Sequence, residues 1–385
     1  MHAPDPLPRP KLRDRLAAER AGETVNVFDP YRVGESVRLS ALALEIVKRF
    51  DGTRTLRDVQ VELTRLTGGT IVPIDKLEGL ATALDQALLL DSPAFAARIG
   101  APVRKPSCIG AHDGNPAVLR KQVAALFTAA GGPGLPASPA PSPHGRLRGV
   151  LVPHMDYARG GVTYGWGFKE LAERTDARLF VVVATSHYSP HRFTLTRQHF
   201  ETPLGVCETD QPFVDRLAAE YGPGLFDDPL AHHPEHSIEL EVVILQHLFA
   251  DRGPIRIVPL LVGSFADCVG GGVGPGEAED IARMTTALRA AEAAAGEPVC
   301  YVISGDLAHI GPKFRDGRKA EGPWLGESER QDRAILAHLE RVDPAGYFGE
   351  IAAERDTRRI CGLPPTYVTL AAARPRVGRV LHYQQ

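Results

Sequence analysis

The sequence predicts an α/β protein. Its main domain is expected to be a three-layer, mostly parallel or mixed sheet with helices on both faces, preceded by a small winged-helix-like α+β domain. Two observations support this. Short β-branched runs are apolar throughout, as in strands buried on both faces. Amphipathic helical segments alternate with these runs, which is typical of a sheet covered on both sides. The predicted strands are residues 147–153, 179–185, 255–262 and 299–304.

Composition limits the classes of function. The chain has 385 residues, 43% hydrophobic and 24% charged, which is ordinary for a globular protein of two or three domains. A net charge of -3 gives no reason to expect nucleic acid or an anionic membrane as a partner. The start of the chain is polar and Pro-rich, and the five cysteines are scattered, so a cytoplasmic protein is expected. The abundance of Ala, Arg, Gly and Pro suggests a bacterial source.

The N-terminal region is expected to form an arm and a small domain. Residues 1–22 are predicted to be a flexible arm with a basic helix over residues 11–20. Residues 23–98 are predicted to be the winged-helix-like domain, in which alternation at residues 25–30 and 36–39 indicates a hairpin. Three helices should follow, with Ser40, Thr55 and Asp75 as their N-caps, over residues 41–50, 56–66 and 77–90.

This small domain resembles the PqqD-like family of peptide-recognition domains. The resemblance rests on Asp29-Pro30 and on residues 37–40, 50–56 and 88–91. It implies that a peptide is recognised, often by adding a strand to a sheet edge. A helical dimerisation or docking appendage without a ligand is the alternative. DNA binding is disfavoured because residues 56–65 have mixed charge rather than a basic face.

Residues 107–385 are predicted to form the main domain. Asn115 should cap a helix with Pro116 in its first turn. Residues 131–145 hold five prolines and are expected to form a flexible loop. The remaining helices are predicted near residues 163–174, 211–220, 237–249, 276–295 and 326–340.

Histidines follow the predicted strands at the points where ligands bind in such sheets. His154 follows the predicted strand 147–153, and His187 follows the predicted strand 179–185. Asp306 and His309 both follow the predicted strand 299–304. Histidines from separate strands can converge at the carboxyl edge of the sheet. This arrangement predicts either a mononuclear metal centre or a histidine acid/base site. Each histidine alone is equally compatible with a structural role.

A denser histidine motif occupies residues 232–239. His236 is expected at a helix N-terminus, where the dipole favours a neutral imidazole, with Ser237 as the cap. A bare surface loop is the alternative for this motif. Glu239 is expected to be a capping or helix-face residue. Asp306 has three interpretations that the sequence leaves open: metal ligand, a group that orients a metal-bound histidine, or helix cap.

Together these motifs resemble the Memo family, also called protein B of the AmmeMemoRadiSam system. The matching pieces are Pro153-His154 with Gly160-Gly161, Ser186-His187, and residues 235–239, 258–263, 304–309 and 359–362. The resemblance implies a fold similar to class III extradiol dioxygenases, which are non-haem Fe(II) enzymes. It also implies a pocket lined by two histidines, here His154 and His187, and by a cysteine.

The aligned cysteine position holds Ala308, and an aspartate position three residues before His236 holds His233. Because alanine cannot bind a metal, we expect His154, His187 and His233 to be the ligands, with His309 or Asp306 as the alternative to His233. His236, Asp306 and His309 are then the candidate catalytic groups. Fe(II) is the expected metal, Cu or Zn the alternatives, and a degenerate site would bind none.

The resemblance implies a metal-dependent, dioxygenase-like enzyme acting on a small-molecule or peptide ligand. It would work in an AmmeMemoRadiSam-type system, with a radical-SAM protein and an AMMECR1-like protein as partners. The alternatives are a non-catalytic protein that binds a peptide or phosphorylated ligand, and a scaffold with a degenerate site.

Overall fold

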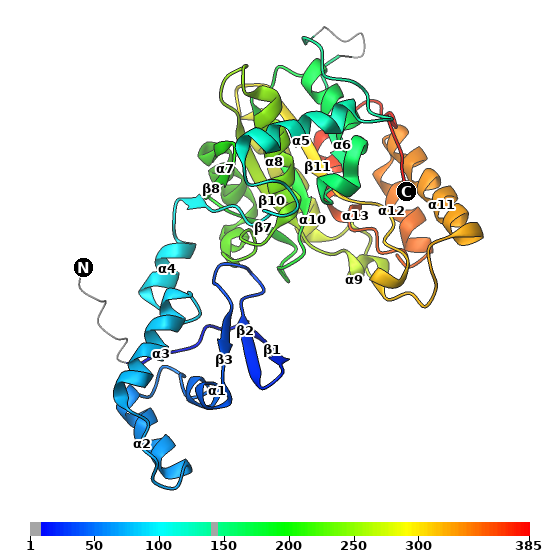
Figure 1. The fold of residues 1–385 in the computed structure, drawn as a ribbon. Coiled ribbons are helices and arrows are strands. Elements are labelled where there is room, and N and C mark those ends of the chain that lie inside the picture. Colours follow the sequence, from blue (N-terminus) through cyan, green and yellow to red (C-terminus); the bar gives the residue numbers. More distant parts are fainter. Residues whose placement is uncertain (1–8, 140–144) are drawn as a thin grey trace. The chain divides into compact units, whose positions relative to one another are not determined.

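The computed structural model describes residues 9–139 and 145–385, and the chain forms two compact units, residues 1–102 and 103–385. Figure 1 labels the helices and strands of both units. The first unit has one hydrophobic core and the second has two. Among the described residues, no helix combines the length and apolar character needed to cross a bilayer. All five cysteines are free thiols.

The first unit combines a three-stranded antiparallel sheet with four helices. The predicted hairpin is confirmed, and Ser40 and Thr55 cap the first two helices as expected. The third helix begins one residue before Asp75, and a fourth was not predicted. The elements are β1 (Ala17–Ala21), β2 (Thr24–Phe28), β3 (Val37–Leu39), α1 (Ala41–Val47), α2 (Leu56–Leu66), α3 (Ile74–Gln86) and α4 (Pro93–Ile99).

The predicted basic helix over residues 11–20 is wrong. Ala17–Ala21 instead forms β1, because Gly22 adopts a positive φ of 64° and turns the chain into β2. Before β1, the Arg13 guanidinium is buried against Asp29 at 3.0 Å. The described part of the expected flexible arm is therefore integrated into the first unit, whereas residues 1–8 lie outside the described residues.

The second unit contains an eight-stranded sheet, which confirms the α/β prediction. Its four predicted strands are adjacent and parallel, in the order β10 (Arg256–Val262), β6 (Leu179–Thr185), β11 (Val299–Ser304) and β5 (Gly149–Val152). The remaining strands were not predicted, and they include antiparallel pairs. They are β4 (Val103–Arg104), β7 (Phe193–Leu195), β8 (His199–Thr202) and β9 (Gly205–Thr209).

Helices cover both faces of this sheet, since successive side chains of β6 enter two different cores. Val181 and Val183 belong to one core, whereas Phe180 and Val182 belong to the other. The first core is shared with α7 (Gln211–Tyr221), α10 (Glu279–Ala293), α12 (Pro344–Ala353) and α13 (Leu363–Ala373). The second is shared with α5 (Pro116–Thr128), α6 (Tyr157–Arg174) and α8 (His236–Phe249).

The Pro-rich segment predicted as a flexible loop contacts α6 along its described part. The Trp166 indole donates to the carbonyl of Gly131 at 3.0 Å, and the Lys169 ammonium donates to that of Leu135 at 2.8 Å. Residues 140–144 lie outside the described residues. Two further helices, α9 (Ala266–Val269) and α11 (Gly322–Glu340), complete the unit.

Candidate metal centre

Three histidine rings converge at the carboxyl edge of the parallel strands. His154 follows β5, His187 follows β6, and His236 is the first residue of α8. The ring centroids of His154 lie 5.0 Å from His187 and 5.2 Å from His236, and those of His187 and His236 are 4.6 Å apart. Asp306, after β11, and Cys361, before α13, complete the cluster. Of the histidines that follow predicted strands, His154 and His187 therefore lie together, and the third ring is His236 rather than His309.

His154 is almost completely buried and is contacted on both ring nitrogens. Its Nδ1 lies 3.3 Å from the Ser304 hydroxyl and its Nε2 lies 3.2 Å from the Cys361 sulfur. Its backbone N–H donates to the Asp306 carboxylate at 3.0 Å. Burial lowers the pKa of His154 to about 4, so the imidazole is neutral near pH 7. A neutral imidazole is the form that binds metal.

His187 is oriented by Glu235, which lies at the end of the loop before α8. The carboxylate lies 2.8 Å from His187 Nδ1 and also accepts the His187 backbone N–H at 2.8 Å. Burial would lower the pKa of His187, but the hydrogen bond and charge of Glu235 raise it. Burial would raise the pKa of Glu235, but the hydrogen bond from His187 and nearby histidine charges hold it at about 2. A carboxylate on Nδ1 leaves Nε2 as the ring nitrogen for a ligand.

Glu235, rather than Ser237, caps α8, so the predicted cap is wrong. Its side chain accepts the Ser237 backbone N–H at 3.3 Å. The Ser237 hydroxyl instead donates to the carbonyl of Thr185 at 2.8 Å, which ties α8 to the end of β6. His236, which follows Glu235, stacks on His187. The pKa of His236 is lowered, and burial is the largest cause.

The cluster contains a cysteine, Cys361, so the expectation that Ala308 leaves the centre without a thiol is wrong. Cys361 comes from a different segment, which returns to the end of β11. The Gly362 backbone N–H donates to the carbonyl of Asp306 at 2.9 Å. A Cβ on Gly305 would lie only 2.5 Å from the Cα of Gly362, so the close approach requires glycine. Burial raises the pKa of Cys361 to about 12. The residue 359–362 motif was the sequence signal for this residue.

Two groups of side chains have ligand atoms within 4.8 Å of one another. One group is His154, His187 and His236, and the other is His154, Asp306 and Cys361. A single transition-metal ion lies roughly 2.0–2.3 Å from N, O or S ligands, which requires ligand atoms within about 4.6 Å of one another. Both groups fit one ion after small adjustments of the side chains, and both depend on His154.

His233 and His309 do not join either group among the described residues. His233 is buried, and its carbonyl accepts a hydrogen bond from Arg104 at 2.9 Å. The third histidine beside His154 and His187 is therefore His236. His309 Nε2 lies 3.8 Å from the Asp306 carboxylate, and its Nδ1 lies 2.9 Å from the carbonyl of Leu307.

Arg104 fixes the loop that precedes α8, a role that sequence reasoning missed. Its fully buried guanidinium donates to the carbonyls of His232 at 2.5 Å and His233 at 2.9 Å. It also pairs with Glu239 at 2.6 Å. Glu239, which was expected to be a capping or helix-face residue, is buried in this ion pair and also contacts His112 at 3.0 Å. The network holds the segment that presents Glu235 and His236.

Comparison with known proteins identifies the family of the second unit. The family model described as "Memo-like protein" matches residues 104–385. A MEMO1 family protein of Aquifex aeolicus is 25% identical over 389 residues, covering 97% of this chain and 94% of the relative. One from Thermus thermophilus is 27% identical over 339 residues, covering 86% and 94%. One from Methanothermobacter thermautotrophicus is 28% identical over 276 residues, covering 71% and 88%. The chain belongs to the Memo-like family.

Proposed function

We propose that the second unit binds one transition-metal ion, with Fe(II) as the first choice, and uses it in a dioxygenase-like oxidoreductase reaction. The observation that supports this most strongly is the convergence of the His187 and His236 imidazoles on the buried His154. Burying the His154 imidazole without a ligand costs desolvation free energy, which a metal ion would offset. The proposed substrate is a small or peptide-derived molecule.

The donor set supports this choice of metal. Imidazole with carboxylate is a ligand combination that suits non-haem Fe(II), whereas the thiol of Cys361 also suits Cu or Zn. When bound, such an ion supplies a Lewis-acid and redox centre. The chain itself supplies Glu235, which orients His187, and Ser304, which lies at Nδ1 of His154.

The side chains of the cluster that do not bind the metal would act as the acid/base groups. If His236 is the third ligand, Asp306 and His309 are the neighbouring groups placed for proton transfer. If Asp306 and Cys361 are ligands, His236 takes that role, which agrees with the expectation from sequence. His236 is therefore a metal ligand in one set and an acid/base group in the other.

Metal analysis of anaerobically purified protein tests the proposal. His154→Ala should lose the metal, because both sets include His154. If His236→Ala loses the metal but Cys361→Ser keeps it, the ligands are His154, His187 and His236. If Cys361→Ser loses the metal but His236→Ala keeps it, the ligands are His154, Asp306 and Cys361. His233→Ala is the matched control and should keep the metal content of the wild type. Full metal content in His154→Ala would refute the proposed centre.

We also propose that the protein acts in the cytoplasm within an AmmeMemoRadiSam-type system. Its partners would be a radical-SAM protein and an AMMECR1-like protein, and the first unit would recognise a peptide. The edge position of β1, and the exposure of residues 18–21 on it, support strand addition. Co-purification of the full chain with both partners tests the system. Wild-type protein that binds a precursor peptide but holds no metal after anaerobic purification would favour the non-catalytic alternative.

A further inference from the structure

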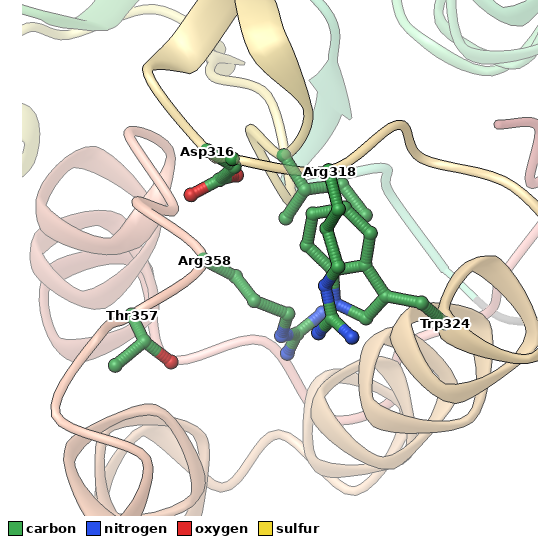
Figure 2. A pocket seen from close by; sticks show the side chains of 7 residues that line it. Asp316, Arg318, Trp324, Thr357 and Arg358 are labelled. Atoms are coloured by element: carbon green, nitrogen blue, oxygen red, sulfur yellow. The ribbon is translucent and has the colours of Figure 1, made fainter.

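A pocket of about 450 Å³ lies beside the segment that follows His309 (Figure 2). The volume is in the range of small-molecule sites. Three parts of the chain form it: the segment after His309, the start of α11 and the segment before Cys361. The lining residues are Ile310, Asp316, Gly317, Arg318, Trp324, Thr357 and Arg358.

Arg318 is held in place by Trp324. Its guanidinium carbon lies 3.9 Å from the centroid of the Trp324 ring, a close cation–π contact. Stacking through the face of the guanidinium leaves its N–H groups free to form two parallel hydrogen bonds. Within the part of the chain that the structure describes, no carboxylate lies at ion-pairing distance from Arg318. In Figure 2 the Asp316 carboxylate points away from it, and that group pairs with Arg359 at 2.7 Å.

Arg358 extends toward the same part of the pocket from another wall (Figure 2). It is buried, and its guanidinium pairs with both Asp332 and Glu354. These two carboxylates neutralise Arg358 and fix it as a wall of the pocket. Arg318 is therefore the cation in the lining that forms no close ion pair among the described residues, although its charge contributes, after the hydrogen bond from Arg359, to lowering the pKa of Asp316.

The pocket and the candidate metal centre are built from the same two segments. The His309 backbone N–H donates to the carbonyl of Arg358 at 2.7 Å. The Arg359 guanidinium donates to the carbonyl of His309 at 2.9 Å. Asp306 precedes one segment and Cys361 ends the other, so the pocket walls continue directly into the metal-centre residues.

We propose that this pocket binds an anionic group, a carboxylate or a phosphate, of a small molecule through Arg318. The indole of Trp324 presents the guanidinium in a fixed orientation, which reduces the entropy lost when the anion binds. If the proposed metal function holds, this pocket is where the substrate is recognised, and that assignment rests on the proposed function. The proposal that the pocket binds an anion is independent of the metal.

Tryptophan fluorescence provides the measurement, because the chain has only two tryptophans. In a Trp166→Phe background, Trp324 is the single reporter, and it is titrated with inorganic phosphate and with benzoate. We expect a saturable change with at least one of them. Adding Arg318→Gln should weaken binding roughly tenfold or more, and Arg318→Lys should give an intermediate loss. Arg315→Gln removes the same charge nearby, outside the pocket lining, and should leave binding unchanged.

Two results would overturn the proposal: no saturable change with either anion, or equal weakening by Arg318→Gln and Arg315→Gln. Thermal unfolding confirms that each variant is folded. If Arg318→Gln is not folded, the anion affinity of Arg318→Lys tests the proposal instead. The two anions separate a carboxylate site from a phosphate site. His154→Ala in the same background should lose metal but still bind the anion, so failure of the metal proposal is distinguishable from failure of this one.

Discussion

His154 links the chemistry of the candidate centre to the stability of the second unit. Its pKa is about 4 in the folded chain, below the usual 6.5, because burial disfavours the charged ring. The unfolded chain therefore binds this proton more tightly, and stability is lost as the pH falls from 6.5 toward 4. We expect metal-free wild type to lose about 3 kcal/mol more than His154→Asn over this interval. Urea unfolding at each pH measures the difference, and parallel stability curves would contradict the expectation.

Arg104 offers a second test at the scale of one residue. Removing its side chain leaves the buried carboxylate of Glu239 without its ion-pair partner. Arg104→Met should therefore destabilise the second unit by about 3–5 kcal/mol. The neighbouring Lys105 pairs with Glu201 near the surface, so Lys105→Met is the matched control and should cost less than about 1 kcal/mol. Chemical unfolding of both variants checks this. Similar losses would mean that the buried network contributes little.

At the scale of elements, the contact between Gly305 and Gly362 carries Cys361 to the end of β11. In Gly305→Ala, the new Cβ would meet the backbone of Gly362, so the returning segment must move. We expect a loss of about 1–3 kcal/mol and faster alkylation of Cys361, followed by peptide mass spectrometry. Gly349→Ala in α12 is the control, since a Cβ there meets no atom within 4 Å. Unchanged alkylation of Cys361 in Gly305→Ala would show that this contact does not position the thiol.

The same elements show how much the sequence could predict. The strands β5, β6, β10 and β11 were predictable because apolar residues dominate each of them. The short strands β8 and β9 were missed because their alternation of polar residues spans only a few positions. The helix predicted over residues 11–20 failed because pairing with β2 outweighed helix propensity. These errors lie where long-range pairing decides the local structure.

The candidate centre was predictable in part for the same reason. His154 and His187 follow apolar strands, so their place at the sheet edge follows from the strand prediction alone. Cys361 follows no strand. Its position depends on a contact between segments more than 50 residues apart along the chain, Asp306 and Gly362, which no local pattern encodes.

For the whole molecule, the separate cores of the two units predict that the second unit folds alone. The family match begins at residue 104, and all the candidate metal ligands lie beyond it. A chain of residues 103–385 should therefore unfold cooperatively and bind as much metal per chain as the full-length protein. Circular dichroism and metal analysis check both expectations.

The start of such a fragment matters because the first strand of the second unit carries Arg104. The sequence alone placed the domain boundary at residue 107, which would remove both β4 and Arg104. A chain of residues 107–385 should then lose the ion pair with Glu239 and the hydrogen bonds that hold the loop before α8. Relative to residues 103–385, it should melt at lower temperature and bind metal more weakly, because Glu235 and His236 lose their support. Equal melting temperatures and metal contents would show that Arg104 is dispensable for presenting the histidines.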